Sequence, residues 1–317
     1  MFAYTVRRTL AIIPLLLGVI LITMLLPQLI PGDIVTMMVG AESPISPERQ
    51  RHMRELLGLD QSLPEQYWNY VVGLVQGDMG HSLRTGQPVA PTLAGRFGLT
   101  AYIALLAVLM GTMIGIPLGI LAARYQRTRL DIFLRIFNLL GLSVPRFWLG
   151  MIFLLIVMLY LRGVFPTVGG AGADASILER LRYAFLPSLT LAIPFSAVVA
   201  RITQSTIFEV LAREYIKVAR SKGLVERTIF WKHALRNALI PVVTVIGLQV
   251  GFIFGGIVEV EAVFSYPGVG TLALRAIEQR DYPILQGVLL SITLLFALIN
   301  LLVDLSYAWL NPQITYD

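Results

Sequence analysis

Six long apolar runs constrain the fold more than any other feature of this sequence. They cover about residues 9–30, 99–123, 137–161, 185–207, 239–260 and 284–310. A helix needs roughly 20 apolar residues to cross the hydrocarbon core of a bilayer. Only 14% of the residues are charged, well below the roughly 25% that is usual in soluble domains. The sequence therefore predicts an all-α membrane protein with six transmembrane helices, the first of them retained and not cleaved as a signal peptide.

The third run is interrupted by a proline and a cation. Pro145 and Arg146 break the apolar stretch that extends from Ile132 to Leu161. In one interpretation Arg146 faces a polar cavity and meets an anionic group of a substrate. In the other it reaches to the membrane interface or neutralises an acid on a partner helix. The sequence leaves both interpretations open.

The positions of lysine and arginine predict the orientation of the spans. Basic residues are concentrated in the N-terminus and in the connections 124–135 and 208–238, and are sparser in 162–184 and 261–283. Because cytoplasmic loops carry the excess of positive charge, we expect both termini and segment 208–238 to lie in the cytoplasm. Segment 31–98 is then on the outer side of the membrane.

Segment 31–98 carries signals for two amphipathic helices. Ser46 and Pro47 can open one that Gly58 ends, and Pro64 can open another that runs to Gln76 before Gly77. The aromatic residues of this segment suit helices that lie at the membrane interface. A small packed cap without membrane contact fits the pattern equally well.

Small residues and prolines mark several spans. Two glycine stripes have helical spacing, namely Gly111, Gly115 and Gly119, then Gly247, Gly251 and Gly255. Such stripes favour close helix packing in a membrane, and a role in lining a substrate pathway is the alternative. Kinks are expected at Pro117, Pro187 and Pro194.

Catalytic and cofactor signals are missing from the sequence. The chain has no cysteine and three widely separated histidines, His52, His81 and His233. There is no G-x-x-x-x-G-K-[ST] phosphate loop and no nucleophile motif. We therefore expect neither an enzyme nor a metal or cofactor site in this chain.

Residues 208–238 are the most informative stretch. They show a basic helical pattern punctuated by Gly223, followed by an apolar cluster of Ile229, Phe230 and Trp231 that we expect to be exposed. A helix, a glycine and a second short helix with exposed apolar side chains could insert into a groove of a cytoplasmic protein. A basic loop resting on anionic lipid headgroups is the alternative.

Several motifs resemble one transporter family. EYIKVARSKG at 214–223 and HALRNALIPVVTVIGLQ at 233–249 resemble the cytoplasmic Glu-Ala-Ala loop of permease subunits in binding-protein-dependent ABC importers. Segments 58–83, 258–287 and 300–314 are similar to the dipeptide/oligopeptide/nickel permeases of the first-subunit type. The sequence departs from the general loop at Lys217, Val218 and Ala219. It also has Arg146 where that family more often has a small or neutral residue.

The resemblance implies a type I ABC importer permease fold with defined parts. These are an N-terminal helix (1–30), a periplasmic segment (31–98), a five-helix permease core (99–310) and a cytoplasmic tail (311–317). Within the core, residues 218–230 would form the coupling helix, and Gly223 would permit its turn. The residues implied in coupling to the ATPase are Glu214, Ala219, Arg220, Lys222, Gly223, Leu224, Glu226 and Ile229. Arg146 and Gln249 are the candidates for lining the pathway.

The resemblance also implies partners and a mechanism. A second permease subunit completes the pathway, two cytoplasmic ATPases bind ATP and magnesium, and a periplasmic or lipid-anchored binding protein delivers the substrate. Peptides are the expected cargo, with glutathione or nickel chelates as alternatives within the family. The competing functional classes are an autonomous channel or ion-coupled secondary transporter, and a membrane scaffold without transport.

Overall fold

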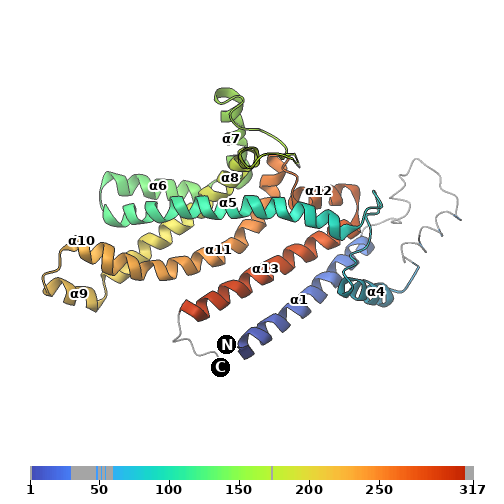
Figure 1. Cartoon of the computed structure of the whole chain (residues 1–317), viewed down its shortest axis with the longest axis horizontal. Helices are drawn as coiled ribbons and strands as arrows, with labels where there is room; N and C mark the ends of the chain where they lie inside the picture. The colour runs from blue at the N-terminus through green and yellow to red at the C-terminus, as the bar shows by residue number, and fades with distance from the viewer. Residues whose placement is uncertain are drawn as a thin grey trace. The chain divides into compact units, whose positions relative to one another are not determined.

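The computed structural model describes residues 2–29, 48, 51, 54, 60–172 and 174–310, and these residues are almost entirely helical (Figure 1). The elements are α1 (Phe2–Leu29), α4 (Leu63–Val75), α5 (Val89–Arg124), α6 (Arg129–Ser143), α7 (Arg146–Tyr160), α8 (Ile177–Leu211), α9 (Glu214–Ser221), α10 (Glu226–Thr228), the π-helical turn η1 (Ile229–Ala234), α11 (Leu235–Val263), α12 (Val269–Gln279) and α13 (Tyr282–Leu310). The expected all-α class is confirmed. The helix predicted over 46–58 and the tail 311–317 lie largely or wholly outside the described residues.

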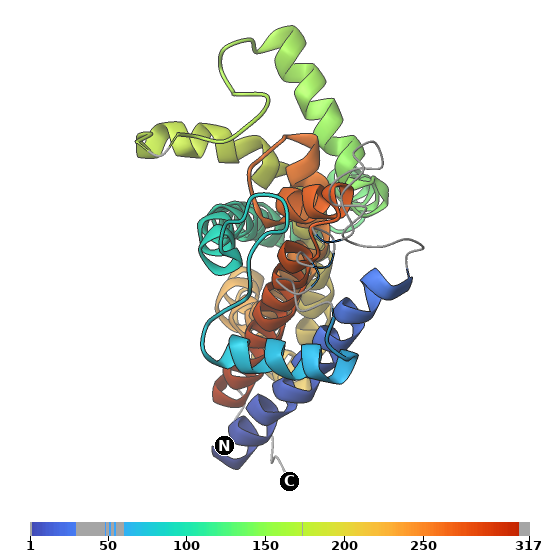
Figure 2. The same ribbon diagram turned by 90° about the vertical axis from the view of Figure 1, so that its right-hand side faces the viewer.

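Five helices are long and apolar enough to cross a membrane, and a bent pair gives a sixth crossing when it is counted as one span. The third predicted span, 137–161, falls on this bent pair, and the interruption predicted at Pro145 and Arg146 is confirmed. The chain bends by 108° between helices α6 and α7, and Figure 2 shows α7 turning away from α6. The cause is local, because the residue before a proline is pushed out of the helical region. Val144 is accordingly extended, and Pro145 caps α7.

The chain divides into two compact units, of which the first comprises residues 1–99 and 268–298. Its apolar core joins the start of α5, α12 and α13 through Val89, Leu93, Val269, Ala273, Ala276, Ile284 and Val288. The loop before α5 is held by the buried carboxylate of Asp281, which accepts hydrogen bonds from Ser82 Oγ at 2.5 Å and from the Leu83 amide at 3.1 Å.

The predicted amphipathic helix over 64–76 is confirmed as α4. Ser62 and Glu65 form a capping box at its start, with the Ser62 amide donating to Glu65 Oε2 at 2.9 Å. These hydrogen bonds from Ser62 lower the pKa of the Glu65 carboxyl. Gly77 follows its end with φ of +84°. Tyr67 donates from its hydroxyl to the Leu17 carbonyl at 3.2 Å, so α4 packs across α1 (Figure 2).

The second unit comprises residues 100–267 and 299–317, and α8 is its most buried long helix. The first glycine stripe packs against α8. A Cβ atom on Gly115 would lie 2.7 Å from both Ser196 O and Val199 Cβ, and one on Gly119 would lie 2.5 Å from Ala200 O. The packing role predicted for this stripe is therefore confirmed. The second stripe differs, because a Cβ on Gly255 would meet nothing within 4 Å.

Candidate coupling segment and transport cavity

The segment between α8 and α11 consists of two helical pieces joined by a glycine turn. Helix α9 ends at Ser221, and Gly223 has φ of +78°. A side chain in this left-handed region is strained, so glycine suits the position. Helix α10 then runs through η1 into α11 without a break. The helix, glycine turn and second helix expected from the sequence are therefore present, with the turn inside residues 218–230.

An ion pair spans the glycine turn. Arg220 Nε donates to Glu226 Oε1 at 2.6 Å, and both side chains are largely exposed. The hydrogen bond to Glu226 and the charge of that carboxylate raise the pKa of Arg220. The Leu224 amide also returns to the Ala219 carbonyl at 3.3 Å. The turn is thus a defined structure with a charged outer surface.

The structure separates the predicted coupling residues by exposure. Glu214, Arg220, Lys222, Gly223 and Glu226 are exposed, whereas Ala219 and Leu224 are half-buried. Ile229 is fully buried, so it cannot present its side chain to another protein.

The apolar cluster that we expected to be exposed is mostly buried. Phe230 is 6% exposed, and only Trp231, at 50%, faces outward. Phe230 packs with Ala123, Ile207, Val210, Ala234 and Ala238, and the Arg124 guanidinium lies 5.9 Å from the centre of its ring. Phe230 therefore anchors the segment to α5 and α8, which sequence periodicity could not reveal.

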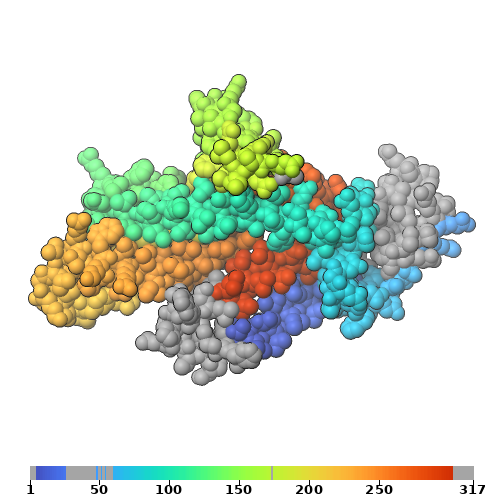
Figure 3. Space-filling model, in the orientation of Figure 1, coloured from blue at the N-terminus to red at the C-terminus, as the bar shows by residue number. Residues whose placement is uncertain are grey.

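Val225, which the sequence analysis missed, is an apolar surface position of this segment. Val225 is 70% exposed, and Trp231 of the same segment is 50% exposed. The segment lies at one end of the second unit, remote from α7 (Figures 1 and 3). This end therefore combines exposed charges with two exposed apolar side chains, a composition that suits a protein contact.

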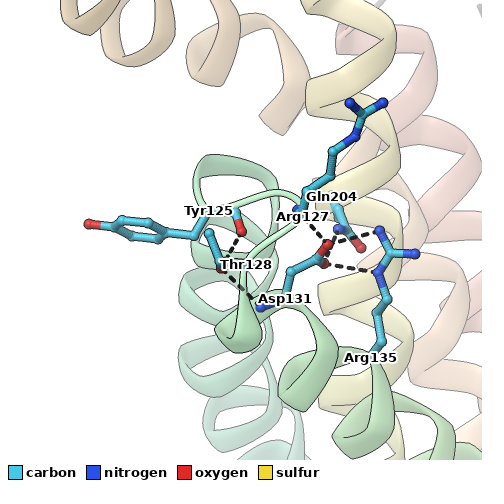
Figure 4. Close-up of polar contacts among 6 residues, drawn as sticks. All are labelled: Tyr125, Arg127, Thr128, Asp131, Arg135 and Gln204. Atoms are coloured by element: carbon cyan, nitrogen blue, oxygen red, sulfur yellow. Dashed lines mark hydrogen bonds and ion pairs between the residues drawn. The ribbon is translucent and has the colours of Figure 1, made fainter.

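A buried acid ties the connection 124–135 to α8 (Figure 4). Asp131 is 2% exposed and accepts from Arg135 Nε at 2.9 Å and Nη2 at 3.0 Å. It also accepts from the Arg127 amide at 3.0 Å and from Gln204 Nε2 at 3.4 Å. The sequence analysis counted only the basic residues of this connection. Their partner, which fixes the start of α6, was missed.

A cavity of about 440 Å³ lies at the junction of α6 and α7, against α8 and α11. Both predicted pathway residues, Arg146 and Gln249, line it, together with Glu259. The remaining walls are mainly apolar and include Leu142, Phe147, Leu191, Phe195, Val198, Phe252 and Ile253. Glu259 was placed only near a span end by the sequence, and no motif marked it as a site residue.

Arg146 is held over a glycine of α11. A Cβ atom on Gly256 would lie 2.6 Å from Arg146 Cζ and 2.7 Å from its Cδ. The guanidinium therefore occupies the space that a side chain at position 256 would enter. Among the described residues, no group of three or more acidic or histidine side chains could hold a metal ion.

Comparison with known proteins gives consistent results. Residues 115–316 match the binding-protein-dependent transport system inner membrane component family, and residues 1–104 match its N-terminal family. The chain is 39% identical to the glutathione transport system permease protein GsiC of Escherichia coli O6:H1 and 40% identical to that of Pectobacterium atrosepticum. Each alignment covers 100% of both chains.

Solved structures show a similar fold. An inward-facing structure of the MetNI methionine ABC transporter matches with a TM-score of 0.57 at 16% identity, covering 69% of this chain and 96% of the other. An amino acid ABC transporter matches with a TM-score of 0.54 at 14% identity, covering 68% and 92%. At this identity the likeness concerns the fold alone.

The apolar helices, the anchored loop and these similarities define a multi-span permease of the inner membrane. The chain belongs to the family of binding-protein-dependent transport system inner membrane components. It is a permease subunit of an ABC importer and has the fold of that class.

Proposed function

We propose that this chain forms half of a peptide pathway and transmits movement from cytoplasmic ATPases through segment 208–238. The observation that carries the proposal is the anchored, outward-facing turn at Gly223. The chain that follows the turn is buried at Ile229 and Phe230, while Arg220 and Glu226 remain exposed. A force applied to this turn would be passed directly to α8 and α11.

In this proposal the chain itself hydrolyses nothing and needs no cofactor. Two ATPase subunits bind ATP and magnesium, and a second permease subunit supplies the other half of the pathway. A periplasmic or lipid-anchored binding protein delivers the cargo. Both termini lie in the cytoplasm and segment 31–98 in the periplasm, which the distribution of basic residues supports. Residues 99–310 act as the permease core, with 1–30 as a separate N-terminal helix.

The exposed residues of the turn would contact the ATPase. Glu214, Arg220, Lys222 and Glu226 carry charges that can pair with it, and Gly223 allows the turn. Ala219 and Leu224 are half-buried and would support the contact from behind. Ile229 would act only by holding the segment in place, since its side chain is fully buried.

The proposed cargo is a short peptide, with Arg146 and Gln249 on its path. Two relatives that align over their full length are named for glutathione, which is itself a tripeptide. In a reconstituted importer, unlabelled dialanine and glutathione should each compete with a labelled dipeptide. Competition by a nickel chelate alone would contradict the peptide assignment.

Cross-linking tests the proposed ATPase contact. Because the sequence lacks cysteine, a single introduced cysteine gives an unambiguous label. Lys222→Cys should cross-link to an ATPase subunit in membranes that contain the whole importer, whereas Asp60→Cys, on the periplasmic side, should not. Labelling of Lys222→Cys by an impermeant maleimide from the periplasmic side would contradict both the contact and the orientation.

A further inference from the structure

The cavity beside the α6–α7 break contains two opposite charges that are not paired with each other. Arg146 and Glu259 both line it. Among the described residues neither side chain has a hydrogen bond or ion pair. Resting on the proposed function, we propose that these two residues form a two-ended recognition site for short peptides whose termini are both free. Arg146 would bind the carboxylate, and Glu259 the ammonium group.

The position of Arg146 supports a ligand role. Its side chain is half-buried and lies over Gly256, where a Cβ atom would overlap the guanidinium. The cation is therefore held at one level of α11. An arginine guanidinium has five donors in a planar fork that matches a carboxylate in two-point contact.

Glu259 lies on the same stripe of α11. It follows Gly256 by three residues, and residues at this spacing are neighbours on one helix face. The rise from Gly256 to Glu259 is about 4.5 Å along the helix axis. The charged termini of a dipeptide sit on Cα atoms roughly 3.8 Å apart, and a tripeptide adds one further residue. The separation along the helix therefore suits two or three residues.

The rest of the cavity suits peptides of varied sequence. Gln249 lies ten residues before Glu259, about 15 Å along the axis, and offers both a donor and an acceptor to peptide groups. The other walls are mainly leucine, phenylalanine, valine and isoleucine, which accept side chains without fixed hydrogen bonds. The two charges thus select the termini, and the apolar walls tolerate what lies between.

Energetics also favour a ligand between the charges. Arg146 is half-buried, whereas Glu259 is exposed, and a desolvated ionisable group in a membrane protein is costly unless it is paired. A zwitterionic peptide would supply a partner to each group at once. Its own charges would be neutralised during passage.

The test compares three probes in the complete importer reconstituted in vesicles: dialanine, dialanine amide and N-acetyl-dialanine. The readout is the uptake ratio of free to blocked peptide in each variant relative to wild type, which removes any selection made by the binding protein. Arg146→Gln should lower the free-to-amide ratio about tenfold, as expected for loss of a charge-assisted contact, and leave the free-to-acetyl ratio unchanged. Glu259→Gln should do the reverse.

Further variants separate recognition from damage to the fold. Gly256→Ala should act like Arg146→Gln because its methyl group displaces the guanidinium, and Arg146→Lys should retain part of the amide discrimination. Arg275→Gln and Glu278→Gln remove exposed charges on α12, outside the cavity, and should leave all ratios as in wild type.

Two outcomes have different meanings. If Arg146→Gln and Glu259→Gln keep the wild-type ratios, or reduce uptake of all three probes equally, the two-ended site is overturned while the importer function stands. If the wild-type importer shows no ATP-dependent uptake of dialanine, the peptide function itself fails.

Discussion

Arg220 and Glu226 contact each other across the turn at Gly223, with 2.6 Å between Nε and Oε1. They belong to different helical pieces, α9 and α10, so the ion pair closes the loop between them. The ion pair therefore links the two helical pieces on either side of the turn. This relationship leads to the first two predictions.

Gly223→Pro should uncouple ATP hydrolysis from uptake while the complex still reaches the membrane. Proline fixes φ at about −65° and has no amide hydrogen. Gly223 has φ of +78°, and its amide donates a hydrogen bond to the Arg220 carbonyl. Uptake and ATP hydrolysis would be measured on the same vesicles. Gly77→Pro is the matched control, because Gly77 has φ of +84° and caps α4 through a similar bond, and it should retain coupling. Normal transport by Gly223→Pro would remove the coupling role from this turn.

Arg220→Glu and Glu226→Arg should each reduce uptake without changing the amount of folded complex. The pair is exposed, and such pairs contribute only about 0–1 kcal/mol to stability. The double exchange restores the ion pair with reversed charges, but we expect it to leave uptake low because in the proposed complex each side chain also contacts the ATPase. Full recovery in the double variant would mean that the pair only shapes the turn.

Gly115→Ala should destabilise the protein by about 1–3 kcal/mol through overpacking, because the new methyl group would overlap Ser196 and Val199. Gly98→Ala is the control in the same helix, since nothing lies within 4 Å of its new Cβ. Thermal unfolding in detergent would compare them. Equal melting temperatures for the two variants would contradict the close contact between α5 and α8.

Asp131→Asn should lower stability by about 1–3 kcal/mol, the cost of weakening hydrogen bonds at a buried acceptor. Glu209→Gln removes an exposed carboxylate that pairs with Arg213 at 3.1 Å, and it should change the melting temperature little. The difference between the two variants measures what burial adds. An Asp131→Asn protein as stable as wild type would mean that this cluster does not fix the start of α6.

Features set by local chemistry could be predicted from the sequence. The start of α4 follows from Pro64 and its end from Gly77, and the stripe from Gly111 to Gly119 identified a packing face. These signals depend on neighbours within a few residues. They need no knowledge of the rest of the chain.

Features set by tertiary contacts could not be predicted. Pro145 signalled an interruption, but the angle between α6 and α7 depends on what each helix packs against. The sequence pattern favours an exposed Phe230 because the partners of this side chain, among them Ala123 and Ile207, are distant in sequence. The sequence places helix α12 within a connection between two spans. Glu259 lines the cavity together with Arg146, which belongs to another helix.

ATP-dependent peptide uptake by the reconstituted importer tests the central claim most directly. Vesicles would contain this chain, the second permease, the ATPases and the binding protein, with each component omitted in turn. The account predicts uptake that needs ATP and every component, and none by this chain alone. Uptake by vesicles containing only this chain, with or without an ion gradient, would contradict it and establish an autonomous carrier.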